Sequence, residues 1–276
     1  MAQTAKLKSA AGRAAKLLKG AGACRLTTYA AAGAYCAFMS LAPLALLAFA
    51  AVSHLPVERE ALVESFLRFV PESLRSFFSG IAELVTAAPA AAAPLGAVLA
   101  LASASSAFLA LLRGMDAAYG DRRSESGVRF RLRGLLWTAA AVAAGVLVFW
   151  LYARSSALLG EKAPGVSVLL RSRGRWPVEF LLLTLVFSLL CGLMPAGRRA
   201  LLRQLPGAAL AAAACTAFTA LFSLTASFTE KYGIYGLLGM VFAAMLWLYW
   251  CLYFLLLGAY ANACLERRGN GGAGPG

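Results

Sequence analysis

Long apolar stretches recur along this chain of 276 residues, and each is long enough to cross a lipid bilayer. A helix needs about 20 residues to span the hydrocarbon core. Only 14% of the residues are charged, against about 25% in an ordinary soluble protein. The pattern predicts an integral membrane protein with one membrane domain over residues 29–264. Six apolar stretches can be drawn, at residues 29–53, 91–118, 133–158, 177–195, 207–228 and 234–264.

These stretches are predicted to be helices rather than strands. Strands of a membrane barrel are about 10 residues long and alternate between apolar and polar side chains, whereas these stretches are longer and apolar on every face. The first stretch also exceeds the apolar region of a cleaved signal peptide, which has about 7–15 residues. We therefore predict an all-α, polytopic fold with six transmembrane helices.

Basic residues are concentrated on one side of this predicted topology. The segments on the side of the two termini carry 17 Lys and Arg residues and four acids, and the other side carries nine and eight. Because positively charged loops stay in the cytoplasm, both termini are predicted to be cytoplasmic. Arg171, Arg173 and Arg175 are the exception on the outer side. Such a one-sided excess fits a membrane protein with lipids as partners and no nucleic acid.

Three segments lie outside or between the predicted spans. Residues 1–28 are basic and suit either an interfacial helix on anionic lipid or a disordered tail. Residues 54–88 contain an amphipathic pattern that predicts a helical cap over the outer mouth of the bundle. Residues 265–276 are rich in glycine and are predicted to be a disordered tail.

The second stretch contains two opposite charges one turn apart, Arg113 and Asp116. In one interpretation Arg113 reaches the lipid headgroups and Asp116 pairs with it or ends the helix. In the other, one stripe of the helix faces the bundle interior or a water-filled path; it consists of Ser103, Ser106, Arg113, Asp116 and Gly120. Small serines would equally allow close helix packing.

Four motifs resemble the YihY/BrkB family of bacterial inner-membrane proteins, formerly labelled ribonuclease BN. They are "AFMSLAP" with Ser40 and Pro43, "SASSAFLALLRGMDAAYG" ending at Tyr119 and Gly120, "LMPAGRRALLRQLPGA", and the "YGIYGLLG…LWLYW…LGAYANA" end of the chain. The family usually has Asn at the position of Asp116 and Glu at the position of Tyr260. The resemblance implies a bacterial inner (cytoplasmic) membrane location and a role in the cell envelope.

The resemblance implies movement of a lipid or another amphipathic substrate, and the sequence has no ATP-binding motif. We therefore predict a transporter or lipid-translocating protein without its own ATPase. Arg113 is the predicted contact for an anionic headgroup, with Asp116 as its partner. Ser103, Ser106 and Tyr119 are predicted to line the same path. The alternative is a membrane scaffold that docks envelope proteins without transporting anything; no sequence feature singles out an oligomeric state.

No enzyme activity, cofactor or metal site is predicted. The chain has six cysteines without a CxxC pair and a single histidine, His54, whereas structural zinc sites use four ligands. A ribonuclease needs paired histidines or clustered acids for its acid–base or metal chemistry. Hydrolase elbows and P-loops are also missing from the sequence. No residue is therefore assigned a catalytic role.

Two prolines and two glycines are predicted to shape the ends and bends of the spans. Pro43 and Pro195 remove backbone donors, so each should kink or end its helix, or serve as a gating hinge. Gly233 and Gly236 permit a tight turn between the last two spans.

Aromatic and small residues mark the last span. Trp247 and its neighbours lie near the middle of that span, where they could pack together or line a substrate path. Asn262 follows Gly258 by one turn and is predicted to bond across helices.

Overall fold

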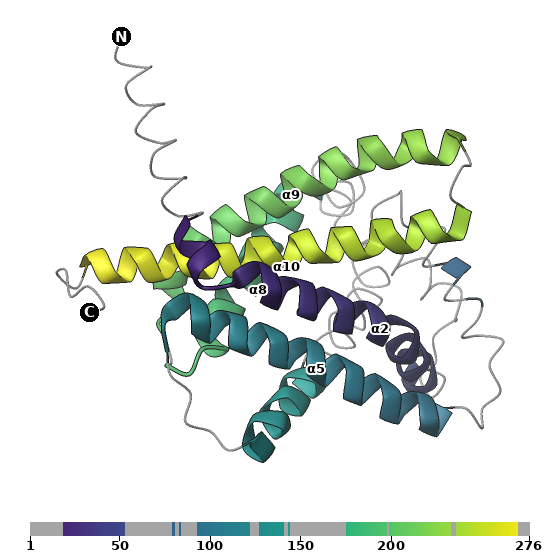
Figure 1. Cartoon of the computed structure of the whole chain (residues 1–276), viewed down its shortest axis with the longest axis horizontal. Coiled ribbons are helices and arrows are strands. Elements are labelled where there is room, and N and C mark those ends of the chain that lie inside the picture. Colours follow the sequence, from purple (N-terminus) through teal and green to yellow (C-terminus); the bar gives the residue numbers. More distant parts are fainter. Residues whose placement is uncertain are drawn as a thin grey trace, which may run out of the picture.

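In the part of the chain that it describes, the computed structural model consists of helices (Figure 1). It describes residues 19–52, 79–80, 83, 93–121, 127–140, 143, 175–197, 199–232 and 236–269. The long helices are α2 (Leu26–Val52), α5 (Ala93–Tyr119), α8 (Arg175–Leu193), α9 (Leu201–Tyr232) and α10 (Gly236–Gly269). Shorter helical segments cover residues 19–23 and 127–140. Within these ranges there is no strand, so the predicted all-α class is confirmed for the described residues.

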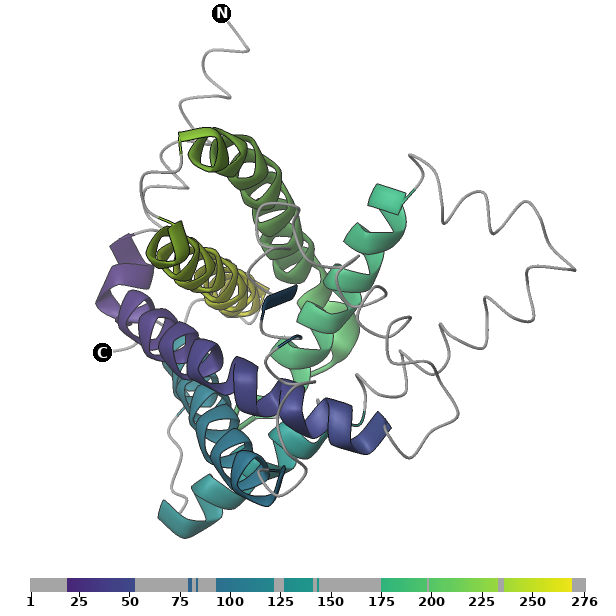
Figure 2. The same ribbon diagram turned by 90° about the vertical axis from the view of Figure 1, so that its right-hand side faces the viewer.

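Helix α10 is the centre of the arrangement. It packs against α9, α2 and α5, while α2 also packs along α5 and α8 packs along α9. Viewed close to the helix axes, α10 lies between α9 and α2, with α5 beyond α2 (Figure 2). The beginning of α2 and the end of α10 lie at the same end of the bundle (Figure 1).

At that same end, the C-terminal ends of α5 and α10 meet the loop between α8 and α9. We call this region the helix junction and define it as residues 116–121, 194–204 and 262–267. Helix α5 ends here because Gly120 has a φ of 78°, which turns the chain out of the helix at little steric cost. The amides of Gly120 and Asp121 then both donate to the carbonyl oxygen of Asp116, at 2.9 Å.

Of the two prolines that are expected to bend or end helices, Pro195 follows the end of a helix and Pro43 lies inside one. Helix α8 ends at Leu193, shortly before the buried Pro195. This position agrees with the expectation that Pro195 ends its helix. Helix α2 continues through Pro43 to Val52.

Two described helices are long and apolar enough to cross a membrane. Leu201–Phe222 in α9 has 22 residues and Val241–Arg267 in α10 has 27, and only 33% and 22% of their most apolar windows is buried inside the protein. Most of that apolar surface therefore faces outward, unlike the core helix of a soluble protein. The segment Phe180–Leu193 of α8 is apolar but shorter. Exposed apolar side chains of this size are best accommodated by lipid.

The helices correspond to five of the six predicted spans, and residues 127–140 include the beginning of the third. The rest of that span, most of residues 1–28 and 54–88, and residues 270–276 lie outside the described part of the chain. Helix α10 runs to Gly269, past the predicted start of the tail at residue 265. In this extension, Glu266 accepts a hydrogen bond from Gln204 on α9, and Arg267 donates one to Tyr119 on α5.

Candidate functional site at the helix junction

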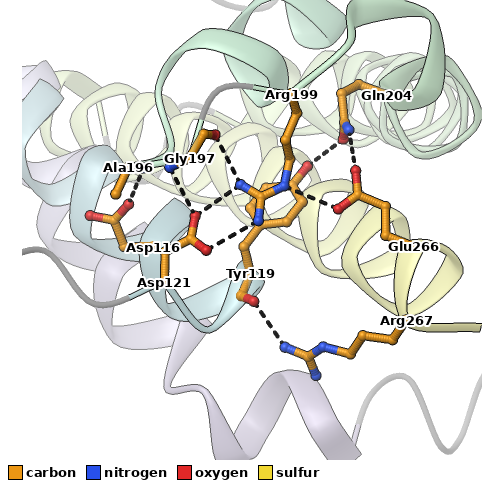
Figure 3. Close-up of polar contacts among 9 residues, drawn as sticks. All are labelled: Asp116, Tyr119, Asp121, Ala196, Gly197, Arg199, Gln204, Glu266 and Arg267. Carbon is orange, nitrogen blue, oxygen red and sulfur yellow. Dashed lines mark hydrogen bonds and ion pairs between the residues drawn. The ribbon is translucent and has the colours of Figure 1, made fainter. Parts of the chain in front are cut away.

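Arg199 is the central side chain of the helix junction. It lies in the loop before α9, and its guanidinium binds Asp121 with two nitrogens, at 2.8 Å for Nη1–Oδ2 and 3.1 Å for Nη2–Oδ1 (Figure 3). Its Nε also donates to Oε2 of Glu266 at 3.1 Å. Two parallel bonds to one carboxylate are the strongest geometry for this pair. One arginine therefore ties the end of α5 to the end of α10.

Tyr119 extends this network on the inner side. Its ring lies under the guanidinium, with the Arg199 Cζ 3.9 Å from the ring centroid. Its hydroxyl donates to Oε1 of Gln204 at 2.5 Å, and Gln204 Nε2 donates to Oε1 of Glu266 at 2.7 Å. Arg267 donates to the backbone carbonyl of Tyr119 at 3.0 Å. Buried polar groups that are bonded in this way hold their helices in one arrangement.

Asn262 joins α10 to α9 directly. Its side chain is fully buried, and its Oδ1 accepts from the amide of Gly207 at 2.7 Å. Its Nδ2 donates to the carbonyl of Gln204 at 2.8 Å. This agrees with the prediction that Asn262 bonds across helices, where an unpaired amide would be costly. Gly258, one turn earlier, lies against Gly207 with their backbones in contact.

Asp116 holds the loop that follows α8. Its side chain is 7% exposed, and Oδ1 accepts from the amide of Ala196 at 2.9 Å. Asp121 likewise accepts from the amide of Gly197 at 3.3 Å. The amides of Ala196 and Gly197 lie in a loop, where no helical hydrogen bond is available to them, and the two carboxylates accept from them instead.

The charge of Arg199 is stabilised by its surroundings. Burial alone would lower the pKa of Arg199, but hydrogen bonds and charges from Asp121 and Glu266 outweigh it and hold that pKa above its ordinary value. The guanidinium is therefore a permanent cation that links two carboxylates. This arrangement is typical of a structural clamp.

Arg113 and Asp116 do not come together in the structure, and their predicted pairing is replaced by other contacts. Arg113 is exposed, and its Cζ lies 5.1 Å from the centroid of the Phe130 ring. Asp116 instead points to the loop residue Ala196. The reason is that α5 places Asp116 on its buried face and Arg113 on its outer face, although they are one turn apart.

The serines of the predicted stripe bond to their own helix. Ser103 donates to the carbonyl of Leu99 at 2.5 Å and Ser106 to that of Ala102 at 2.9 Å. Ser106 is exposed and Ser103 half-buried, whereas Tyr119 is buried. The predicted path is thus divided: Ser106 and Arg113 lie on the outer face of α5, and Asp116 and Tyr119 belong to the helix junction.

The other predicted residues lie apart from this junction. Ser40 is buried and donates to the carbonyl of Ala37 at 2.7 Å. The indole nitrogen of Trp247 donates to Thr219 on α9 at 3.1 Å, which supports the packing interpretation of that aromatic group. Gly236 begins α10, and Gly233 lies outside the described residues.

Several junction residues were not identified from the sequence as site residues. In the sequence, Asp121, Arg199 and Glu266 stand out only as charges on the cationic side. A usable signal existed, because Asp116, Asp121 and Glu266 are three of only four acids among 17 basic residues on that side. An acid in such surroundings has a specific partner to stabilise it.

The junction carboxylates are occupied by backbone amides and guanidinium groups. Within the described part of the chain, no three His, Cys, Asp or Glu side chains are grouped in a way that could hold a metal ion. The arrangement binds helix ends together, and Arg113 lies outside it, exposed on the neighbouring surface.

Together, the outward-facing apolar helices and the polar helix junction define an α-helical membrane protein. The chain belongs to the family described as Virulence factor BrkB, whose profile matches residues 17–275. The resemblance inferred from the four motifs is therefore confirmed.

A relative at the level of the whole chain is the "Putative ribonuclease-like protein YfkH" of Bacillus subtilis (strain 168). It is 27% identical over 242 residues, covering 85% of this chain and 88% of that protein. No solved structure matches the chain.

Proposed function

We propose that this protein moves lipids or other amphipathic molecules across a bacterial cytoplasmic membrane, without an ATPase of its own. It spans the membrane six times and keeps both termini in the cytoplasm. The headgroup of an anionic substrate binds Arg113 at the cytoplasmic end of α5.

The observation that carries this proposal is the exposed charge of Arg113. Its guanidinium contacts the ring of Phe130, and among the described residues it has no ion pair with a carboxylate. Asp116, the nearest candidate in sequence, is turned toward Ala196. Such an arginine, at the end of a membrane-spanning helix, is available for a phosphate. The guanidinium binds a phosphate with two nitrogens.

The outer face of α5 suits the apolar part of such a molecule. Ser106 lies two turns from Arg113 on the same exposed face, and Leu99 and Val98 are exposed further along the helix. A headgroup at Arg113 with acyl chains along these apolar residues would match the amphipathic character of a lipid.

The arrangement of the helix ends supports the topology. The start of α2 and the end of α10 lie at one end of the bundle, as an even number of crossings requires. Exposed basic residues lie at that end or close to it: Arg203 lies in the first turn of α9, Arg267 contacts the end of α5, and Arg129 and Arg131 flank Phe130, which Arg113 contacts. Under the positive-inside rule that end faces the cytoplasm.

We further propose that the protein is not a ribonuclease, although the name of the Bacillus relative contains that word. The carboxylates at the junction stabilise Arg199 and backbone amides, which leaves them poorly placed for general acid–base work. Both ideas can be tested on one preparation.

Purified protein is reconstituted into liposomes that contain a fluorescent anionic phospholipid in both leaflets, and a membrane-impermeant reductant is added outside. Wild type should expose nearly all of the label, whereas protein-free liposomes expose the outer half. Arg113→Ala should slow this movement about tenfold, which corresponds to the loss of one charge-assisted contact of about 1.4 kcal/mol.

The matched control is Arg203→Ala, which removes another exposed arginine at the same end of the bundle. It should leave the rate unchanged, and Arg113→Lys should retain part of it. If folded wild type moves no lipid above the empty liposomes, the proposal is wrong; a stable envelope partner that copurifies would then favour a scaffold. Cleavage of RNA by wild type that Asp121→Asn abolishes would contradict the non-enzymatic part.

A further inference from the structure

Helices α9 and α10 pack in an antiparallel pair along a continuous line of small and polar residues. We call this line the α9–α10 seam. Each step along α9 toward its end is matched by a step along α10 toward its beginning. The contacting pairs are Gln204 with Asn262, Gly207 with Gly258, Cys215 with Cys251, and Thr219 with Trp247.

The glycine pair sets how close the two helices come. A Cβ atom added to Gly207 would lie 2.3 Å from the carbonyl oxygen of Gly258, and one added to Gly258 would lie 2.5 Å from that of Gly207. The two backbones are therefore in direct contact, as small residues allow in membrane helices. Cys215 and Cys251 follow two turns further along the same faces.

At that position the two thiols touch. The Cys215 Sγ and Cys251 Sγ atoms are 3.1 Å apart, and both cysteines are free. A disulfide bond is about 2.05 Å long, so a closure of about 1 Å between the sulfurs would form one. The other described cysteines make no such sulfur–sulfur contact with one another within the described residues.

We propose that Cys215 and Cys251 form an oxidisable dithiol that closes into a disulfide between α9 and α10. The oxidant is a hydroperoxide, a class of molecule that enters membranes. Cys251 is half-buried and Cys215 is 6% exposed, so Cys251 meets the oxidant first.

The reaction has two steps that balance. The Cys251 sulfur attacks the outer oxygen of the hydroperoxide, the O–O bond breaks, and the products are a sulfenic acid on Cys251 and an alcohol. The Cys215 sulfur then attacks the Cys251 sulfur, and its proton leaves with the hydroxyl group as water. Overall, two thiols and one hydroperoxide yield one disulfide, one alcohol and one water.

The bond would fix α9 to α10 near the middle of both helices. The seam is held at one end by Asn262 and the glycine pair next to it, and further along by Trp247 and Thr219. A covalent link between these contacts would prevent α9 and α10 from separating or sliding.

The test uses full-length protein in detergent micelles, treated with tert-butyl hydroperoxide. Free thiols are then alkylated in denaturant and counted by intact mass. Wild type should fall from six free thiols to four, with a peptide map that joins Cys215 to Cys251. Cys215→Ser and Cys251→Ser should each form no disulfide and retain a reducible sulfenic acid or free thiol instead.

A variant that keeps only this pair isolates the reaction. It carries Cys24→Ser, Cys36→Ser, Cys191→Ser and Cys264→Ser. It should lose two hydrogen atoms in mass on oxidation and regain them with a phosphine reductant. If this variant does not fold, the peptide map of the wild type decides. The proposal is overturned if the two thiols persist in folded protein, if they oxidise separately to sulfinic acids, or if the disulfide joins Cys24 to Cys264.

Discussion

Two arginines at the same end of the bundle have opposite surroundings. Arg199 is enclosed by two carboxylates and lies over the ring of Tyr119. Arg113 is exposed and contacts the ring of Phe130. Both use an aromatic face, but only Arg199 has its charge neutralised among the described residues. The comparison indicates that Arg199 links helix ends, whereas Arg113 is the arginine to which the proposed function assigns the headgroup.

The largest effect is expected from Arg199→Ala. The substitution removes the guanidinium that Asp121 and Glu266 share, and removing one member of a partly buried pair is strongly destabilising. We expect a loss of about 3 kcal/mol in the free energy of unfolding. It can be measured by thermal or detergent-induced unfolding in micelles.

The control for this change is Arg203→Ala, which alters an exposed arginine on the next turn of the chain. Its effect should stay within about 0.5 kcal/mol. Equal losses for the two variants would show that the ion pairs of Arg199 contribute nothing specific.

A smaller loss is expected from Arg199→Lys. Lysine keeps the positive charge, but its ammonium cannot bind Asp121 with two parallel donors while also reaching Glu266. We expect a loss of about 1 kcal/mol, between those of wild type and Arg199→Ala. The same unfolding series measures it. A lysine variant as unstable as the alanine variant would mean that the fork geometry, and not the charge, accounts for the whole effect.

The sequence predicted well what depends on local patterns. The existence and approximate positions of α9 and α10 follow from apolar runs, because a helix needs only its own residues to satisfy its backbone, although α9 begins at Leu201 and so exceeds the predicted span of 207–228. The bonding of Asn262 across helices was also predictable, since an amide inside a membrane helix must find a partner.

The partners themselves could not be predicted. Arg113 and Asp116 are one turn apart, a spacing at which opposite charges on a helix commonly pair. In the structure, however, Asp116 bonds to Ala196. That contact depends on how α5 and the loop after α8 are placed in space, and no local pattern contains this information.

The next prediction separates the contribution of the Tyr119 hydroxyl to stability from that of the Tyr119 ring. Tyr119→Phe removes the donor to Gln204 Oε1 but keeps the aromatic face under Arg199. We expect a loss of about 1 kcal/mol in the free energy of unfolding, the usual value for one hydrogen bond. Tyr249→Phe is the control, because that hydroxyl has no hydrogen bond within the described helices. A loss of no more than that control would mean that the Tyr119 hydroxyl does not stabilise the junction.

The smallest effect on stability is expected from Arg113→Ala, and it tests the comparison most directly. An exposed arginine over one aromatic ring contributes about 0.5 kcal/mol, so the free energy of unfolding should barely change. Under the proposed function, lipid movement should nevertheless fall, because the charge proposed to bind the headgroup is gone. Measuring unfolding and lipid movement on the same preparation separates the two roles. A variant that unfolds as readily as Arg199→Ala would show that Arg113 is structural after all, because only a residue with unrecognised partners could have so large an effect on folding.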